Sequence, residues 1–207
     1  MILCDIGNYK VDFFNDGRIW SMTHREFCSY KSKEKIYYIS VNENISNRLK
    51  NISNFINVES YFKFDTIYQG IGIDRVAACT VINDGMIVDA GSAITIDIMS
   101  NSLHLGGFIL PGLSAYKKCY SSISDRLAVG LKPNIDLDAL PQKTEDAVSY
   151  GIIKPILMIL EESRKDKMIY FTGGDGKFFS KYFENSIYDK TLIFRGIKKV
   201  LKEKKLC

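Results

Sequence analysis

The sequence is poor in histidine, proline and tryptophan, and it lacks a long apolar run. Its 207 residues include 2 His, 4 Pro and 1 Trp. The most apolar later stretch, residues 152–160, contains Lys154 and Pro155 and is far too short to span a bilayer. Asp5 interrupts the opening apolar run and no basic residue precedes it, so no secretory signal is expected. These absences predict no membrane partner and a cytoplasmic location.

The cysteines and histidines show no spacing typical of a metal site or a disulfide framework. His24 and His104 are isolated, without the partners of a catalytic triad or a zinc site, so we interpret both as structural. The cysteines are odd in number, widely scattered and without a Cys-x-x-Cys pair, which predicts reduced thiols. They are Cys4, Cys28, Cys79, Cys119 and Cys207.

The charge balance is mildly basic and gives no sign of a nucleic-acid partner. There are 28 Lys and Arg against 24 Asp and Glu, a formal net charge of +4. Much of the lysine excess lies in residues 197–206, where it is typical of a terminal helix with a solvated basic face. A nucleic-acid arm would instead interleave arginines or aromatic residues with the lysines.

Two segments resemble copies of one strand-turn-strand unit. Asp5-Ile6-Gly7-Asn8 and Asp89-Ala90-Gly91-Ser92 both follow an apolar run, and both continue into a β-rich segment. Each supplies a carboxylate and a glycine turn with exposed backbone N–H groups. Two such hairpins facing each other could hold a polyphosphate and its metal ion. The repeat therefore points to a nucleotide-dependent phosphotransferase.

The apolar patterns predict an α/β chain whose second half repeats the first, divided into residues 1–73 and 74–207. Period-two runs and glycine turns predict strands, and period-3.6 runs predict helices. We expect strands over residues 2–4, 10–14, 18–22, 36–41, 86–89, 93–99, 103–109 and 168–171. We expect helices over residues 45–52, 74–81, 113–122, 144–162, 176–183 and 192–203.

Several polar residues in these elements could carry chemistry. Asp5 could hold Mg²⁺, although the same hairpin could simply be an Asx-type turn. Asp89 and the Ser92 hydroxyl are hard oxygen ligands for Mg²⁺ or a monovalent cation. Asp74 could orient a substrate hydroxyl and accept its proton, with Arg75 beside an anionic group. Alternatively, Asp74 is only the N-cap of its helix.

Glycine-rich segments and a helix start add further candidates. Gly106-Gly107 with Pro111-Gly112 predicts an exposed backbone before a helix N-terminus, which attracts anions. The segment Thr172-Gly173-Gly174-Asp175 follows a strand, where α/β sheets bind ligands, and it is not a Walker A motif. Helix capping alone explains Thr144-Glu145-Asp146.

Taken in order, these motifs resemble those of the type III pantothenate kinases, in the acetate and sugar kinase, Hsp70 and actin superfamily. The resemblance covers nearly the whole chain. Its motifs are Asp5-x-Gly7-Asn8, Gly72-x-Asp74-Arg75, Asp89-x-Gly91-Ser92-x-x-Thr95-x-Asp97, Gly106-Gly107 with Pro111-Gly112, Thr144-Glu145-Asp146-Ala147 and Thr172-Gly173-Gly174-Asp175.

The resemblance implies two RNase H-like (actin-like ATPase) halves, each a mixed sheet flanked by helices, with ATP bound between them. It implies transfer of the ATP γ-phosphate to the 4′-hydroxyl of pantothenate, the first step of coenzyme A synthesis. The implied cofactors are Mg²⁺ and an activating K⁺ or NH₄⁺. A homodimer is also implied, with the pantothenate pocket at the subunit interface.

The resemblance further implies a role for each matching residue. Asp74 would be the catalytic base, Asp5 would serve Mg²⁺ and Asp89 would bind the monovalent cation. The acceptor would contact Tyr68, Gly72, Ile73, Asp74, Arg75 and, from the neighbouring subunit, Thr144. ATP would contact Asp5, Ile6, Gly7, Asn8, Tyr9, Lys10, Ser92, Thr172, Gly173 and Gly174.

One departure from the family pattern concerns the first hairpin. Tyr9 stands where the family usually has Ser or Thr, which would shift a phosphate contact to Lys10. Two other hypotheses stay open from the sequence. One is a non-catalytic transcriptional accessory factor, and the other is a related kinase with a different hydroxyl acceptor, because the superfamily shares its phosphate hairpins while acceptor pockets differ.

Overall fold

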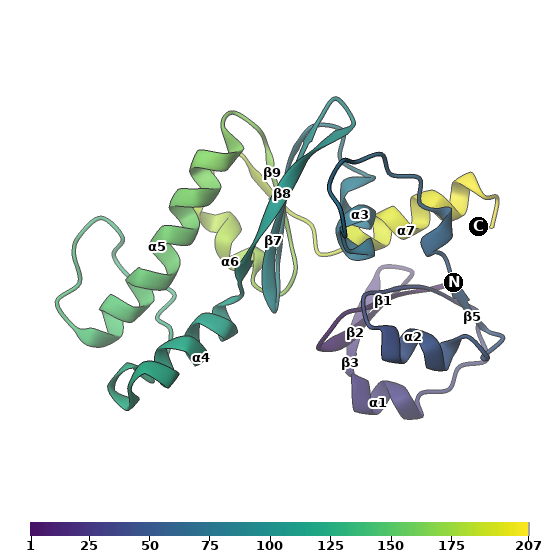
Figure 1. Ribbon diagram of the computed structural model, residues 1–207, viewed down its shortest axis with the longest axis horizontal. Coiled ribbons are helices and arrows are strands. Elements are labelled where there is room, and N and C mark those ends of the chain that lie inside the picture. The colour runs from purple at the N-terminus through teal and green to yellow at the C-terminus, as the bar shows by residue number, and fades with distance from the viewer. Residues whose placement is uncertain (207) are drawn as a thin grey trace. The chain divides into compact units, whose positions relative to one another are not determined.

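A computed structural model describes residues 1–206, and Cys207, expected to be a reduced thiol, lies outside the described residues. By their contacts the residues form two compact units (Figure 1). The first unit comprises Met1–Asn83, Met99–Gly106 and the chain from Thr191 onward, and the second comprises Asp84–Ile98 and Gly107–Lys190. The predicted division at residue 73 into RNase H-like halves stays a prediction.

The first unit is built on a five-stranded sheet in the order β3-β2-β1-β4-β5. β1 pairs antiparallel with β2 and parallel with β4, so the sheet is mixed. Its strands are β1 (Ile2–Ile6), β2 (Lys10–Asn15), β3 (Arg18–Thr23), β4 (Ile36–Ser40) and β5 (Phe55–Asn57).

Helices cover both faces of this first sheet (Figure 1). Alternate residues of a strand point to opposite faces, so Cys4 packs with α1 and α2 while Leu3 packs with α3 and α7. These side chains are at most 1% exposed. The helices are α1 (His24–Ser29), α2 (Glu43–Leu49), the 3₁₀ turn η1 (Glu59–Tyr61), α3 (Ile73–Cys79) and α7 (Leu192–Glu203).

The second unit repeats this topology. Its sheet has the order β8-β7-β6-β9-β10, so the first strand is again central between the second and the fourth. The fourth strand again pairs parallel with the first, as β9 does with β6. The strands are β6 (Gly85–Ala90), β7 (Ala93–Ser100), β8 (Leu103–Pro111), β9 (Ile169–Thr172) and β10 (Ser186–Tyr188), of which the end of β7 and the start of β8 group by contacts with the first unit.

The core of the second unit lies between its sheet and the long helix α5. Val88 and Ile96 of the sheet share one buried cluster with Ile152 and Leu160 of α5. Figure 1 shows α5 running alongside this sheet. The helices are α4 (Leu113–Ile123), η2 (Asp125–Leu127), α5 (Thr144–Arg164), α6 (Gly176–Phe179) and η3 (Ser180–Tyr182).

Most predicted elements are present, and the differences have local causes. The short helix α1 was not predicted, although Thr23 and Glu26 form the reciprocal capping box that marks such a start. The predicted N-cap of α3 is wrong, because Gly72 occupies that position and Asp74 lies in the first turn. The capping interpretation of Thr144 is also wrong, because the cap residue of α5 is Lys143.

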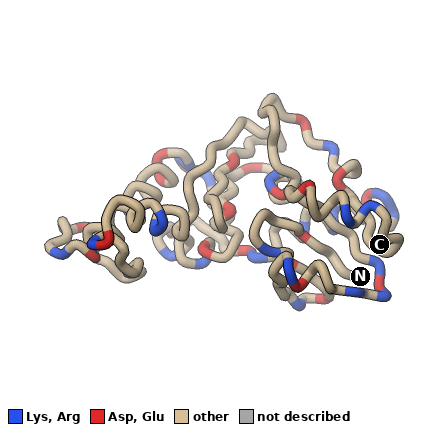
Figure 2. Tube along the Cα trace, turned by 60° about the horizontal axis from the view of Figure 1, so that its bottom comes forward, with Lys and Arg blue, Asp and Glu red and all other residues tan. Residues whose placement is uncertain are grey.

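The surface agrees with two expectations from composition. Figure 2 shows basic positions gathered along the last helix near the C-terminus, as its solvated lysine face requires. Within the described chain Cys4, Cys28, Cys79 and Cys119 form no disulfide. Over residues 1–206, none of the helices combines the length and apolar character that crossing a bilayer demands.

Candidate functional site

The first candidate hairpin is the turn between β1 and β2. The Gly7 N–H donates to the Lys10 carbonyl at 3.1 Å, which closes the turn. Ile6 is fully buried, and its carbonyl accepts the Val41 N–H at 3.0 Å, so it shapes the turn from within. Asn8, Tyr9 and Lys10 are exposed, and Tyr9 is 70% exposed. The expected ATP-binding residues of this segment therefore form one turn with an accessible rim.

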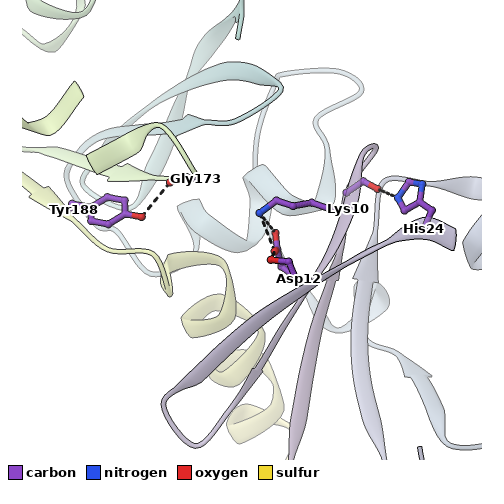
Figure 3. Close-up of polar contacts among 7 residues, drawn as sticks. Lys10, Asp12, His24, Gly173 and Tyr188 are labelled. Atoms are coloured by element: carbon purple, nitrogen blue, oxygen red, sulfur yellow. Dashed lines mark hydrogen bonds and ion pairs between the residues drawn. The ribbon is translucent and has the colours of Figure 1, made fainter. Parts of the chain in front are cut away.

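Two carboxylates stand opposite each other at this hairpin. Asp5 on β1 is the direct register partner of Asp12 on β2, and like charges in such a pair are unfavourable. The Lys10 ammonium lies 2.9 Å from Asp12 and offsets part of this repulsion (Figure 3). The Ser21 hydroxyl also donates to Asp12. The remaining negative charge and hard oxygen donors fit a cation such as Mg²⁺.

His24 supports the same turn from α1. Its Nε2 lies 2.9 Å from the Gly7 carbonyl oxygen, and it must be the donor because a carbonyl only accepts (Figure 3). The side chain is partly buried. The sequence indicated no partner for His24. In the structure it contacts the backbone of the candidate phosphate hairpin.

The Asp74-Arg75 pair lies in the first turn of α3. Asp74 Oδ1 accepts the Arg75 N–H at 2.7 Å, and the residue is partly exposed. Gly72 and Ile73 immediately precede the pair and are partly exposed as well. A side chain at position 72 would meet Asp74 Oδ1, with its Cβ 2.5 Å from that oxygen. The glycine therefore leaves room for the carboxylate.

Tyr68 lies beside this pair. The Arg75 guanidinium carbon is 4.7 Å from the centroid of the Tyr68 ring, a cation–π contact. Arg75 is 6% exposed. The structure therefore brings together the five residues of the first unit that the sequence assigns to the acceptor.

The second candidate hairpin joins β6 to β7 through Gly91 and Ser92. The Gly91 N–H donates to Ala93 O at 2.9 Å, and Ser92 is exposed. The Gly112 N–H donates to the Ser92 carbonyl at 3.2 Å. A Cβ on Gly112 would come within 2.3 Å of the Gly91 carbonyl, so only glycine permits this approach. Gly106 and Gly107, by contrast, lie within β8 rather than in the predicted loop.

The loop after β9 lies against Asp89. Thr172 is the parallel register partner of Asp89, and Gly173 follows with φ of +79°. A Cβ on Gly173 would lie 2.3 Å from Asp89 Oδ1 and 2.5 Å from the Ala90 carbonyl oxygen. The Tyr188 hydroxyl donates to the Gly173 carbonyl at 3.3 Å (Figure 3). Carboxylate and carbonyl oxygens gather here, a donor set that fits K⁺ or another hard cation.

Asp175 completes this loop. Its N–H donates to the Ala90 carbonyl at 2.9 Å, which ties the loop to the end of β6. Burial raises the pKa of the Asp175 carboxyl above its ordinary value of 3.8. Gly174 is exposed beside it. The predicted ATP-binding segment of residues 172–174 therefore adjoins Asp89 in the second unit.

Thr144 is exposed at the first turn of α5. The next two residues, Glu145 and Asp146, both bind the Lys132 ammonium, at 3.0 and 2.8 Å. These carboxylates raise the pKa of Lys132 above its ordinary value of 10.5. The acidic first turn thus fixes a neighbouring loop, and the Thr144 hydroxyl stays on the surface.

Comparison with known proteins identifies the family. The profile described as Type III pantothenate kinase matches residues 53–165. A Type III pantothenate kinase of Campylobacter jejuni is 57% identical over 203 residues, which are 98% of this chain and 97% of the relative.

Two solved structures share the fold of this chain. A Campylobacter jejuni protein described as a conserved Baf family transcriptional activator is 54% identical, with a TM-score of 0.93 and full coverage of both chains. A Sinorhizobium meliloti protein described as a 2-dehydro-3-deoxygalactonokinase has a TM-score of 0.58 at 6% identity, covering 98% of this chain and 96% of its own. The predicted fold is therefore confirmed as the two-sheet α/β fold of sugar kinases and actin-like ATPases. The chain belongs to the type III pantothenate kinase family.

Proposed function

We propose that this protein transfers the γ-phosphate of ATP to the 4′-hydroxyl of pantothenate, the first step of coenzyme A synthesis. The observation that carries the proposal is the Asp74-Arg75 pair at the start of α3, in a chain 57% identical to a type III pantothenate kinase. The pair offers an accessible carboxylate next to a cation held by an aromatic ring. An alcohol acceptor requires both features.

In the proposed reaction Asp74 takes the proton of the acceptor hydroxyl. The acceptor oxygen forms a bond to the γ-phosphorus while the bond from that phosphorus to the bridging oxygen of ADP breaks. The loose transition state of phosphoryl transfer depends more on positioning and charge neutralisation than on a strong base. An ordinary carboxylate at position 74 is therefore sufficient. Arg75 binds an anionic group next to the reacting centre.

ATP is proposed to contact the hairpin of residues 5–10 and, in the second unit, Ser92 with residues 172–174. The N–H groups of the exposed turn and of the glycine loop can bind phosphate oxygens without a dedicated Walker A motif. Lys10 supplies a positive charge in place of the short Ser or Thr hydroxyl that Tyr9 replaces. Its side chain is 55% exposed, although the ammonium also pairs with Asp12.

Two metal ions are proposed to assist. Mg²⁺ would neutralise phosphate charge, and Asp5 with its negative register partner Asp12 supports a site for it. A monovalent cation, K⁺ or NH₄⁺, would bind at Asp89, where the Ala90 carbonyl adds a second hard oxygen close to the same loop. The residues hold these ions through oxygen atoms alone.

The acceptor is proposed to bind Tyr68, residues 72–75 and, from a second copy of the chain, Thr144. Exposed apolar side chains of the second unit, including Leu140 at 78% and Met158 at 62% exposure, are candidates for the interface of the proposed homodimer. Sedimentation at enzymatic concentrations would test the dimer. We expect the enzyme to work in the cytoplasm, because ATP and the coenzyme A pathway are cytoplasmic.

The test is ATP consumption that depends on pantothenate, Mg²⁺ and K⁺, with the phosphorylated product identified by mass spectrometry. Asp74→Asn should lower kcat at least a hundredfold while the unfolding temperature stays close to wild type. Asp166→Asn, which changes an exposed acid on the loop after α5, is the matched control and should retain full activity. If a panel of acceptors showed phosphorylation of other alcohols but not of pantothenate, the proposed substrate would be wrong.

The relative described as a transcriptional activator raises a second candidate, binding to DNA. The lysines of α7 are the only feature of the described chain that we find to favour it. DNA binding that weakens steeply with salt, in a protein without kinase activity, would support this alternative. Kinase activity with no DNA binding at physiological salt would eliminate it.

A further inference from the structure

His104 belongs to an aromatic and polar cluster next to the acceptor residues. It is the second residue of β8, in the segment Met99–Gly106 that groups with the first unit. The side chain is 6% exposed, so its ring nitrogens lie in the interior. Buried polar atoms require hydrogen-bond partners, and the identity of those partners indicates what the ring does.

Thr66 connects His104 to the backbone of Tyr68. The Thr66 hydroxyl oxygen lies 2.7 Å from Nδ1 of His104. The same oxygen accepts the Tyr68 N–H at 3.0 Å. A hydroxyl has one hydrogen and two acceptor positions, so it can satisfy both groups at once. The imidazole and the Tyr68 backbone are therefore fixed through a single atom.

The His104 ring also contacts the Tyr68 ring directly. The two ring centroids are 6.0 Å apart with planes inclined by 58°. The centroid of the Phe64 ring lies 5.4 Å from the centroid of the imidazole. Tyr68 is consequently restrained at its backbone by Thr66 and at its ring by His104.

This restraint extends to Arg75, which stacks on Tyr68 at 4.7 Å. A guanidinium is a planar fork, and the plane of the aromatic ring beneath it sets the direction in which the fork points. Arg75 is also only 6% exposed, so its buried position limits the other orientations that the guanidinium can adopt. The orientation of the Tyr68 ring therefore matters for whatever Arg75 binds.

We propose that His104 is a positioning residue for the acceptor site, which acts with Thr66 to hold Tyr68 and, through its ring, the Arg75 guanidinium in the orientation that binds the acceptor. The inference rests on the proposed function for the identity of the acceptor. The competing explanation is that His104 only fills space in the core. The two explanations predict different effects for changes that preserve shape.

Steady-state kinetics of two pairs of variants, one pair at Thr66 and one at His104, separate these explanations. Thr66→Val keeps the shape but loses the hydroxyl, and His104→Phe keeps a ring but loses both ring nitrogens, in a cluster that also holds Cys79 and Asp97. Both should raise KM for pantothenate about tenfold, with KM for ATP and kcat within about threefold of wild type. Thr66→Ser keeps the hydroxyl and should stay near wild type. His104→Asn keeps a hydrogen-bonding group near Nδ1 and should recover part of the loss.

The double variant Thr66→Val/His104→Phe adds a stricter criterion. Both changes break the hydrogen bond between Thr66 and His104, while each also alters one contact of its own with Tyr68, so their effects on KM should be less than additive. Fully additive effects, equal changes in KM for both substrates, or wild-type kinetics in His104→Phe would each overturn the proposal. Urea unfolding identifies any variant that fails to fold. Because Val is nearly isosteric with Thr, the KM of Thr66→Val for pantothenate then decides between a positioning role and a space-filling role.

A measurement without substrates separates this inference from the proposed function. In protein labelled with ¹⁵N and ¹³C at arginine, the Tyr68 ring should shift the Arg75 side-chain protons upfield, with Arg75→Lys assigning the signals. Thr66→Val and His104→Phe should remove at least half of that shift, as Tyr68→Leu removes all of it. An unchanged shift overturns the positioning role. If the wild-type protein does not phosphorylate pantothenate, the proposed function fails while this spectrum still decides the role of His104.

Discussion

The two hairpins have the same place in their sheets but are supported in different ways. The β1–β2 turn is held by side chains, with His24 on the Gly7 carbonyl and Lys10 on Asp12. The β6–β7 turn is held by the backbone of Gly112 and Gly173, which approach so closely that a Cβ would collide. A turn supported by side chains can tolerate replacement of its own residues, whereas one packed against backbone cannot.

The largest effect should come from filling the backbone contact of the second hairpin. In Gly112→Ala the new Cβ would meet two backbone carbonyl oxygens, at 2.3 Å from Gly91 and 2.5 Å from Ser92. We expect a loss of about 3 kcal/mol in the free energy of unfolding. Displacement of the hairpin by about 1 Å should lower kcat/KM about a hundredfold. Urea unfolding and steady-state kinetics measure the two effects.

Gly130→Ala is the control for this change. Gly130 lies in the same unit, and nothing lies within 4 Å of a Cβ placed there. Its stability and activity should match wild type. If Gly112→Ala behaved like Gly130→Ala, the second hairpin would be as tolerant as the first and the contrast between them would disappear.

The next effect tests the side-chain support of the first hairpin. His24→Leu removes the donor to the Gly7 carbonyl, whereas His24→Gln can keep a donor at that end of the side chain. We expect His24→Leu to raise KM for ATP about tenfold, because a lost hydrogen bond to a backbone carbonyl costs up to about 1.4 kcal/mol. KM for pantothenate should change little in the same assays.

His24→Gln should restore at least half of the lost affinity for ATP. Equal losses in the two variants would mean that the ring volume, rather than the hydrogen bond, supports the turn. An unfolding curve for each variant ensures that the comparison is between folded proteins.

A smaller effect is expected from the Lys10–Asp12 pair. The Lys10 side chain is 55% exposed and the Asp12 side chain 23%, so losing the pair should change the free energy of unfolding by less than about 0.5 kcal/mol. ATP binding should respond more. Lys10→Met removes a positive charge from the phosphate hairpin and should raise KM for ATP about fivefold.

Asp12→Asn should act in the opposite direction at saturating Mg²⁺. It frees the Lys10 ammonium and removes the like charge opposite Asp5, so KM for ATP should fall about twofold. A rise in KM of the same size as in Lys10→Met would show that the ion pair itself, rather than the lysine charge, forms the binding surface.

The sequence predicted features that depend on local chemistry. The turn at Gly7 and the turn at Gly91 follow from an apolar run, an acid and a glycine, so both hairpins and the repetition of the first half by the second could be inferred. The helix α7 follows from its apolar period and agrees with its predicted bounds. The start of α1 was equally local, since its capping box is visible at Thr23 and Glu26, but that signal was not used.

Other features could not be read from the sequence because they depend on contacts between distant residues. His24 reaches Gly7 across 17 positions, and His104 reaches Thr66 across 38. No spacing rule predicts which carbonyl or hydroxyl a lone histidine will meet. The cap of α3 illustrates a different limit, because Gly72 and Asp74 are both acceptable helix starts and the sequence does not distinguish them.

The smallest expected effect concerns Asp175, in the loop that packs on the second hairpin. Burial raises the pKa of its carboxyl, so folding favours the protonated form. That contribution to stability is complete below the ordinary pKa of 3.8 and is lost as pH rises through the higher folded-state pKa. Asp175→Asn cannot ionise and keeps the backbone N–H that binds the Ala90 carbonyl.

The variant should therefore match wild type near pH 4 and be slightly more stable at pH 7. The gain should stay under about 0.5 kcal/mol, because solvent screens the exposed side of the carboxylate. Urea unfolding at the two pH values measures the difference. A gain that is largest at pH 4 would reverse the sign of the argument. It would mean that the carboxylate stabilises the loop, and that the second hairpin, like the first, depends on a charged side chain.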